Sequence, residues 1–373
     1  MDVAIAEPQD ADGAVTTDIV GLIDCDVHPS LRAPSDLDPF LSERWRAHRN
    51  VYPTRLRQPL TEALAYPRIA PAIARGDAWP PNGLPPGSDL AFMREQHLDA
   101  FGIAYAVLMP LLRDNGWHER NIDYGVALCS AINLWQIAAW LEPDHRLRGS
   151  IVVAPEHPEA AIAEIERHAK DRRFVQVTMP PRSIEPLGRP RYRAIFEAAA
   201  ACGLPVGFHV AAPTAGHPSS GGGWASYYFE DHYSGVTSME ALVTSLVVEG
   251  VFEQVPNLRI VLIEAGFAWL PALKWRLDKH WKRLREEVPH LRRAPSEYIR
   301  DGVWCTTQPV DEPEKRPHLI DAISWVGWDR IMFSTDYPHW DFDDPRYALK
   351  IPLSPAEKRL VLHDNARALY RLG

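Results

Sequence analysis

Short apolar runs alternate with longer amphipathic stretches along most of this chain. The runs are rich in Val, Ile and Phe, which favour strands, whereas the stretches between them space apolar residues three and four apart, as helices do. The predicted strands are Val20–Asp26, Ile103–Met109, Gly149–Val153, Phe174–Thr178, Pro205–Val210, Arg259–Glu264, Val303–Thr306 and Arg330–Thr335. The predicted helices are Asp123–Leu141, Pro158–Lys170, Arg191–Ala201, Ser238–Gln254, Pro271–Glu287 and, with Ser354 as N-cap, Pro355–Arg371.

This alternation predicts an α/β fold, and eight β/α units favour a closed (β/α)8 barrel over an open doubly wound sheet. Neither G-x-G-x-x-G nor G-x-x-x-x-G-K-[ST] follows the first strand, which disfavours a nucleotide-binding fold. In such a barrel the carboxyl ends of all strands meet at one mouth, where active sites are built.

Two irregular stretches follow predicted strands and should therefore lie at the mouth. The longer, at about 29–90, contains Pro80-Pro81 and Pro85-Pro86, and we expect an ordered insertion covering the mouth. The other is Ala211–Gly235, which includes three consecutive glycines. We expect residues 1–18 to form a flexible arm and residues 19–373 to form one domain.

Bulk composition narrows the classes of protein. The net charge of −9 disfavours a nucleic-acid partner, and no apolar stretch suggests a membrane span. The N-terminus lacks the basic start and apolar core of a signal peptide, so we expect a cytoplasmic protein. The four cysteines form no C-x-x-C pair, which excludes a thiolate zinc knuckle and disfavours a disulfide framework.

Candidate chemistry begins at Asp26-Val27-His28, at the end of the first predicted strand. Residues i and i+2 of a strand point the same way, so this carboxylate and imidazole form a chelating pair. Taken without the rest of the chain, Asp26 and His28 are better explained as a capping aspartate and a structural histidine than as metal ligands. However, His209, Glu264 and Asp336 lie at the ends of three other predicted strands. Several buried carboxylates at one mouth would be costly without a cation, which predicts a divalent metal site.

These residues carry a family resemblance. The order D-x-H on the first strand, His209 on the fifth and Asp336 in S-T-D-Y-P-H on the eighth resembles the amidohydrolase superfamily. The chain is most similar to its amidohydrolase-2 branch, which includes aminocarboxymuconate-semialdehyde decarboxylase and γ-resorcylate decarboxylase. The resemblance implies that Asp26, His28, His209 and Asp336 are metal ligands and that Asp336 also handles a proton. It also implies a homodimer or a hetero-oligomer with a related subunit.

Glu264 departs from that branch, whose decarboxylase-like members carry a histidine at the end of the sixth strand. The departure weakens the expectation of a decarboxylase. It also adds a carboxylate to the ligand set, with His232 as a further candidate ligand on the loop after the fifth strand. Zn²⁺ is expected for a single-ion site, and Fe or Mn, with two ions, for the alternative.

Three functions remain open from the sequence. The first is a metal-dependent lyase (decarboxylase) or hydrolase acting on a small organic acid or amide-like substrate. The second is an oxygen-dependent hydroxylase with a dinuclear Fe or Mn site, and the third is a metal-binding, non-catalytic partner subunit. The candidate catalytic residues are Asp336, Glu264 and His232. Arg113 and Trp224 are candidates for binding the substrate, Arg113 because it can hold a carboxylate through two hydrogen bonds.

Overall fold

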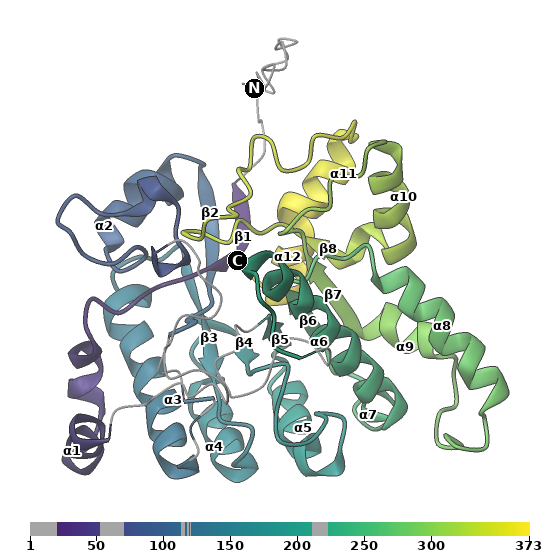
Figure 1. Ribbon diagram of the computed structural model, residues 1–373, viewed down its shortest axis with the longest axis horizontal. Coiled ribbons are helices and arrows are strands. Elements are labelled where there is room, and N and C mark those ends of the chain that lie inside the picture. The colour runs from purple at the N-terminus through teal and green to yellow at the C-terminus, as the bar shows by residue number, and fades with distance from the viewer. Residues whose placement is uncertain (1–20, 53–70, 113–115, 118, 120, 211–222) are drawn as a thin grey trace.

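Eight parallel strands form the centre of the protein, in the order β1 to β8 (Figure 1). The computed structural model describes residues 21–52, 71–112, 116–117, 119, 121–210 and 223–373. The predicted N-terminal arm therefore lies outside the described residues. The strands are β1 Leu22–Val27, β2 Ile103–Leu108, β3 Leu147–Val152, β4 Phe174–Thr178, β5 Val206–His209, β6 Ile260–Ile263, β7 Val303–Thr306 and β8 Ile331–Met332.

The barrel closes where β1 meets the chain that continues from β8. The Cys25 N–H donates to the Phe333 carbonyl at 2.9 Å, and the Asp336 N–H donates to the Asp26 carbonyl at 3.1 Å. Helices lie outside the strands (Figure 1), so the predicted (β/α)8 barrel is confirmed. The helices are α1 Glu43–Val51, α2 Leu90–Met93, α3 Ile122–Gln136, α4 Pro158–His168, α5 Arg193–Ala201, α6 Tyr228–Val248, α7 Val251–Gln254, α8 Leu270–Arg283, α9 Pro295–Gly302, α10 Pro317–Val326, α11 Pro355–Arg359 and α12 Asn365–Tyr370.

The largest error in the predicted elements concerns the helix after β5. Helix α6 starts at Tyr228, ten residues before the predicted start, so His232 lies on a helix and not on a loop. Gly235 makes this stretch look irregular, but a Cβ there would come within 3.3 Å of Val210, so the glycine allows close helix packing. The predicted helix is also split, because Gly250 adopts φ 73° between α6 and α7.

The inside of the barrel is a packed core. Tyr370 of α12 packs against the apolar side chains that point into the barrel, and its hydroxyl donates to Gln176 Oε1 at 3.0 Å. A polar site therefore has room only at the strand ends, as is usual for this fold. The apolar side chains that line the interior include Ile23, Cys25, Val107, Met109, Val175, Val261, Ile263 and Met332.

One helical stretch, Ile122–Leu141, is long and apolar enough to cross a membrane by length and composition. It spans α3 and the π-helical turn that follows, and 61% of its most apolar window is buried inside the protein. Its polar side chains also bind the barrel, since Asn133 donates to the Val152 carbonyl and Gln136 to the Ser150 carbonyl. The stretch therefore has the packing of a core helix.

The described parts of the insertion contact the mouth. Ala74 forms an antiparallel bridge with His339, and the Ser30 N–H donates to the Gly87 carbonyl at 2.8 Å. Gly87 adopts φ 73°, and a Cβ there would lie 2.4 Å from the His28 carbonyl oxygen. The insertion is therefore held directly against the end of β1 and the loop after β8.

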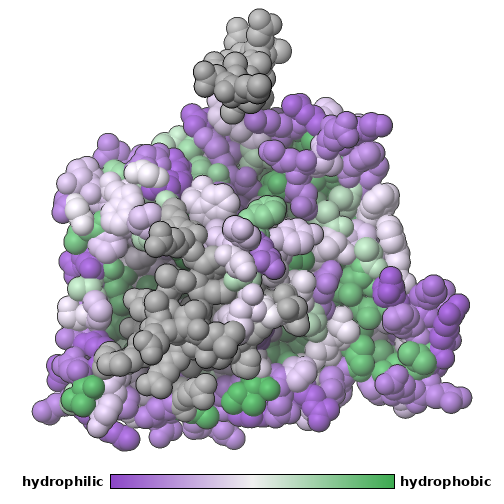
Figure 2. Space-filling view, in the orientation of Figure 1, coloured by the Kyte–Doolittle hydropathy of each residue, from purple (hydrophilic) through white to green (hydrophobic). Residues whose placement is uncertain are grey.

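The basic residues of α8 lie on a solvated surface. Its last turn contains His280, Lys282 and Arg283. This end of α8 projects at the right of Figure 1, and Figure 2 shows that corner covered mostly by hydrophilic side chains.

Candidate metal centre

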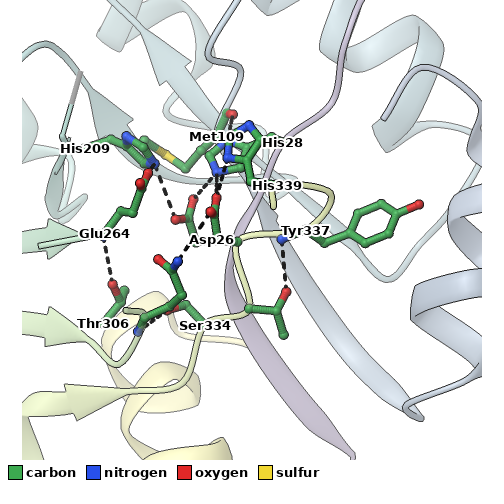
Figure 3. Close-up of polar contacts among 12 residues, drawn as sticks. Asp26, His28, Met109, His209, Glu264, Thr306, Ser334, Tyr337 and His339 are labelled. Atoms are coloured by element: carbon green, nitrogen blue, oxygen red, sulfur yellow. Dashed lines mark hydrogen bonds and ion pairs between the residues drawn. The ribbon is translucent and has the colours of Figure 1, made fainter. Parts of the chain in front are cut away.

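Five side chains from four strand ends converge at the mouth, and Figure 3 labels four of them, Asp26, His28, His209 and Glu264. Asp26 and His28 come from β1, His209 from β5, Glu264 follows β6, and Asp336 follows β8. One ligand atom from each lies within 4.8 Å of those of all the others. All five are almost completely buried, Glu264 being the most exposed at 9% of its side chain. The structure thus brings together these five predicted ligands, whereas the further candidate, His232, lies in a neighbouring cluster.

Local irregularities of the backbone turn two of these carboxylates into the mouth. Cys25 and Ile263 face the barrel interior, so regular alternation would send Asp26 and Glu264 outward. The pairing of β1 with β2 shifts register between Asp24 and Val27, and this irregularity re-aims Asp26. Glu264 adopts φ 53°, a strained conformation, and its N–H donates to Thr306 Oγ1 at 3.2 Å.

The two histidines present their Nε2 atoms to the carboxylates. His28 Nδ1 donates to the Met109 carbonyl at 2.8 Å, and His209 Nδ1 donates to the Val210 carbonyl. Because a carbonyl only accepts, the proton of each neutral ring is on Nδ1 and the Nε2 lone pair faces the cluster. His28 Nε2 lies 2.7 Å from Asp336 Oδ1, and His209 Nε2 lies 2.7 Å from Glu264 Oε2.

Several of these buried atoms lack a hydrogen bond. Four such atoms have no hydrogen-bond partner of good geometry among the described residues. They are both side-chain oxygens of Asp26, Nε2 of His28 and Nε2 of His209. Such atoms are rare in protein interiors unless a ligand satisfies them. Carboxylate oxygens and imidazole nitrogens are the donors that divalent metals take, so the residues present fit a metal ion.

The charges of the cluster are strongly coupled. Burial alone would lower the pKa of His209, but Asp26 and Glu264 outweigh it and raise that pKa to about 10. Burial would raise the pKa of Asp26, but His28 and His209 bring it down to about 2. Burial and the charge of Glu264 raise the pKa of Asp336 well above its usual value. The two imidazoles thus offset two of the three carboxylates, and Asp336 is the carboxylate whose ionised form has no cationic partner of its own.

A buried carboxylate that the sequence analysis missed lies behind the cluster. Asp24 Oδ1 accepts from the N–H groups of Asp26, at 3.2 Å, and Thr335, at 3.0 Å. Asp24 Oδ2 accepts from Thr335 Oγ1 at 2.5 Å and from His97 Nε2 at 2.8 Å. Asp24 therefore fixes β1 to the residue that precedes Asp336. The signal was an acidic residue inside an apolar strand, two positions before Asp26.

A second cluster shares Glu264 with the first. It consists of Glu264, His232 of α6 and Asp341, which follows β8 and was not predicted. His232 Nε2 lies 3.3 Å from Glu264 Oε1 and 3.1 Å from Asp341 Oδ2. Asp341 lies on an irregular loop five residues after Asp336, so no periodic pattern singles it out.

His339 contacts the first cluster, whereas the structure does not test the two residues predicted to bind the substrate, Arg113 and Trp224. His339 Nδ1 lies 2.6 Å from Asp336 Oδ1, and its ring stacks on His28 at 4.2 Å between centroids, so it orients both. Arg113 lies outside the described residues. Trp224 is half-buried ahead of α6, and its role in binding a substrate stays a prediction.

Known proteins resemble this chain along almost its whole length. A family model described as Amidohydrolase matches residues 23–372. A gamma-resorcylate decarboxylase of Rhizobium sp. (strain MTP-10005) is 29% identical over 233 residues, which cover 58% of this chain and 67% of the relative.

Solved structures share the fold at lower identity. An amidohydrolase from Mycobacterium avium subsp. paratuberculosis K-10 has a TM-score of 0.70 at 22% identity, covering 94% of this chain and 99% of its own. A 5-carboxyvanillate decarboxylase from Novosphingobium aromaticivorans, complexed with manganese and 4-hydroxy-3-methoxy-5-nitrobenzoic acid, has a TM-score of 0.69 at 20% identity. It covers 94% of this chain and 96% of its own.

Proposed function

This chain belongs to the amidohydrolase family, and we propose that within it the protein is a metal-dependent decarboxylase of hydroxylated aromatic acids. The observation that carries the proposal is the five-residue cluster at the mouth, whose buried Asp26, His28 and His209 atoms point inward without hydrogen bonds. The decarboxylases named above support the choice of reaction and of substrate class.

The cluster would hold one divalent cation through Asp26, His28, His209 and Asp336, with Glu264 beside them. A bound cation supplies a Lewis acid for substrate oxygens. We propose Mn²⁺, because three carboxylates make the donor set rich in oxygen and a structural neighbour holds manganese. Zn²⁺, expected from the sequence, is the alternative that a metal analysis would distinguish.

Asp336 is the residue that we propose as proton donor. Its carboxyl group lies in the cluster, and His339 contacts it at 2.6 Å. A proton delivered to the ring carbon that bears the carboxylate allows the bond between them to break. The electron pair of that bond stays with the ring, and carbon dioxide leaves. His339 can pass its Nδ1 proton to Asp336 while its Nε2 takes up a proton from water, so the proton consumed in the reaction comes from solvent. Glu264 would act as a ligand.

The other functions considered from the sequence have less support. An oxygen-dependent hydroxylase would need a redox metal and O₂, and a partner subunit would have no activity of its own. Two of the three similar proteins named above are decarboxylases, which favours the lyase over these functions and over a hydrolase.

The test is release of carbon dioxide without oxygen. The Mn²⁺-loaded protein is incubated anaerobically with 2,6-dihydroxybenzoate and with 5-carboxyvanillate, and carbon dioxide and the phenolic product are measured. We expect equal amounts of both products from at least one substrate. Asp336→Asn should lower kcat by about 10²–10⁴, the usual contribution of a positioned acid, and His209→Ala should abolish activity by removing a ligand.

The matched control is His318→Ala, which removes an exposed histidine of α10 and should leave kcat unchanged. Product formation that requires O₂ would contradict the proposal. Absence of carbon dioxide from both acids, with metal bound, would also contradict it.

A further inference from the structure

We propose that the mouth holds a second divalent cation, bound by His232, Glu264 and Asp341, and that Glu264 bridges the two ions. This inference does not rest on the proposed decarboxylase activity. It rests on the way the second cluster shares Glu264 with the first.

The two oxygens of Glu264 face different histidines. Oε2 lies 2.7 Å from His209 Nε2, in the first cluster, and Oε1 lies 3.3 Å from His232 Nε2, in the second. A carboxylate divided in this way has the disposition of a bridging ligand. The strained φ of 53° at Glu264 sets this orientation, and strain of this kind is typical of functional positions.

His232 has an unsatisfied nitrogen directed at the second cluster. Its Nε2 is shielded from solvent, yet it makes no hydrogen bond of good geometry to any described residue. It lies 3.1 Å from Asp341 Oδ2 and 3.3 Å from Glu264 Oε1, so three donor atoms surround one point. These are two carboxylates and one imidazole, donors suited to Mn²⁺ or Fe²⁺.

Surrounding side chains hold this second cluster in place. Gln308 Nε2 donates to Asp341 Oδ2 at 3.0 Å and is 3.4 Å from Asp336 Oδ2, so one amide links the two clusters. The rings of Tyr228 and Trp340 pack against His232 at 5.5 and 5.6 Å between centroids. Contacts that orient ligands are a usual part of metal sites.

Charge balance favours two ions over one. Together the clusters contain four carboxylates, those of Asp26, Glu264, Asp336 and Asp341. With neutral histidines, one divalent ion would leave two buried negative charges, whereas two divalent ions neutralise all four. The competing arrangement has His232 protonated, acting as a cation between Glu264 and Asp341.

The experiment counts manganese. Protein stripped of metal with a chelator is dialysed against increasing MnCl₂, and bound Mn is measured by elemental analysis and by electron paramagnetic resonance. We expect two Mn²⁺ per chain, with a spectrum of two exchange-coupled ions, because two-metal sites place their ions about 3.5–4 Å apart.

Variants assign the second ion to its ligands. Asp341→Asn and His232→Asn should each keep the first Mn²⁺ and weaken the second by at least about 10–100-fold, the loss caused by removing even a residue that only orients a ligand. Both should abolish the coupled spectrum. Asp344→Asn is the matched control on the same loop, where the carboxylate pairs with Arg346, and it should keep both ions.

One Mn²⁺ per wild-type chain at saturation would overturn the proposal and favour a protonated His232. A second Mn²⁺ that binds equally well to Asp341→Asn and His232→Asn would also overturn it. If one variant fails to fold, as judged by thermal unfolding, the other variant and the wild-type count decide. Two ions without decarboxylation would contradict only the proposed function, and one ion with decarboxylation only this inference.

Discussion

At the scale of single residues, Asp24 shows how a side chain outside the cluster can control it. Its two oxygens accept hydrogen bonds from Asp26, Thr335 and His97, and all of these groups are buried. Asp24 thereby fixes the positions of two proposed ligands, Asp26 directly and Asp336 through its neighbour Thr335. It acts through these residues and does not face the metal.

Asp24→Asn should therefore weaken binding of the first Mn²⁺. The amide has one acceptor oxygen instead of two, so at least one of the buried donors loses its partner. Loss of a residue that orients ligands lowers metal affinity about 10–100-fold, and equilibrium dialysis with MnCl₂ measures it. Thr335→Ser, which keeps the hydroxyl that donates to Asp24, should bind Mn²⁺ like the wild type. Wild-type affinity in Asp24→Asn would show that Asp24 has no positioning role.

The residues of the site could be predicted from the sequence to different degrees. Asp26, His28, His209 and Asp336 follow from their positions at strand ends, because the barrel brings all strand ends together. The inward turn of Glu264 depends on a left-handed φ, which alternation along a strand does not predict.

At the scale of elements, the insertion acts as a wall fixed to the mouth. Gly87 is in contact with the end of β1, where a Cβ would lie 2.4 Å from the His28 carbonyl oxygen. Gly83 has a similar backbone conformation, φ 77° against 73°, but a Cβ there would meet nothing within 4 Å. Substituting each of these two glycines therefore adds similar backbone strain, but only a substitution at Gly87 adds a clash with the end of β1.

Gly87→Ala should destabilise the protein by about 1–3 kcal/mol more than Gly83→Ala, the usual effect of forcing extra atoms into a packed region. It should also lower Mn²⁺ affinity, because the clash displaces His28. Chemical unfolding measures the first effect and dialysis the second. Equal unfolding free energies and equal affinities for the two variants would mean that the insertion does not press on β1.

Helices and strands were easier to predict where apolar residues recur with a regular period, and harder where a single close contact determines the structure. Strands β1 to β7 and the helices α3, α4, α5 and α8 follow their apolar periodicity closely. Strand β8 is shorter than the predicted Arg330–Thr335 and consists of Ile331–Met332 alone. Helix α6 was placed too late because Gly235, needed for close packing on Val210, is typical of loops in a sequence. Because of that error, His232 was predicted on a loop, whereas it lies on α6 with its Nε2 close to Glu264.

At the scale of the whole molecule, one barrel gathers charges that are far apart in the chain. Asp26 and Asp336 are separated by most of the sequence, yet His28 lies within 3.2 Å of both carboxylates. The interior below them is lined mainly by apolar side chains and packed by Tyr370 of α12, so it offers these charges little stabilisation. Folding of the barrel therefore assembles a site that needs a cation.

The presence of that cation can be observed directly. Crystals of the Mn²⁺-loaded protein, measured at the manganese absorption edge, give an anomalous difference map. The account predicts a peak within coordination distance of Asp26, His28, His209 and Asp336, about 2.0–2.2 Å for nitrogen and oxygen ligands, and no such peak in His209→Ala crystals. A map without a peak at the mouth, from protein that binds manganese in solution, would contradict the central claim.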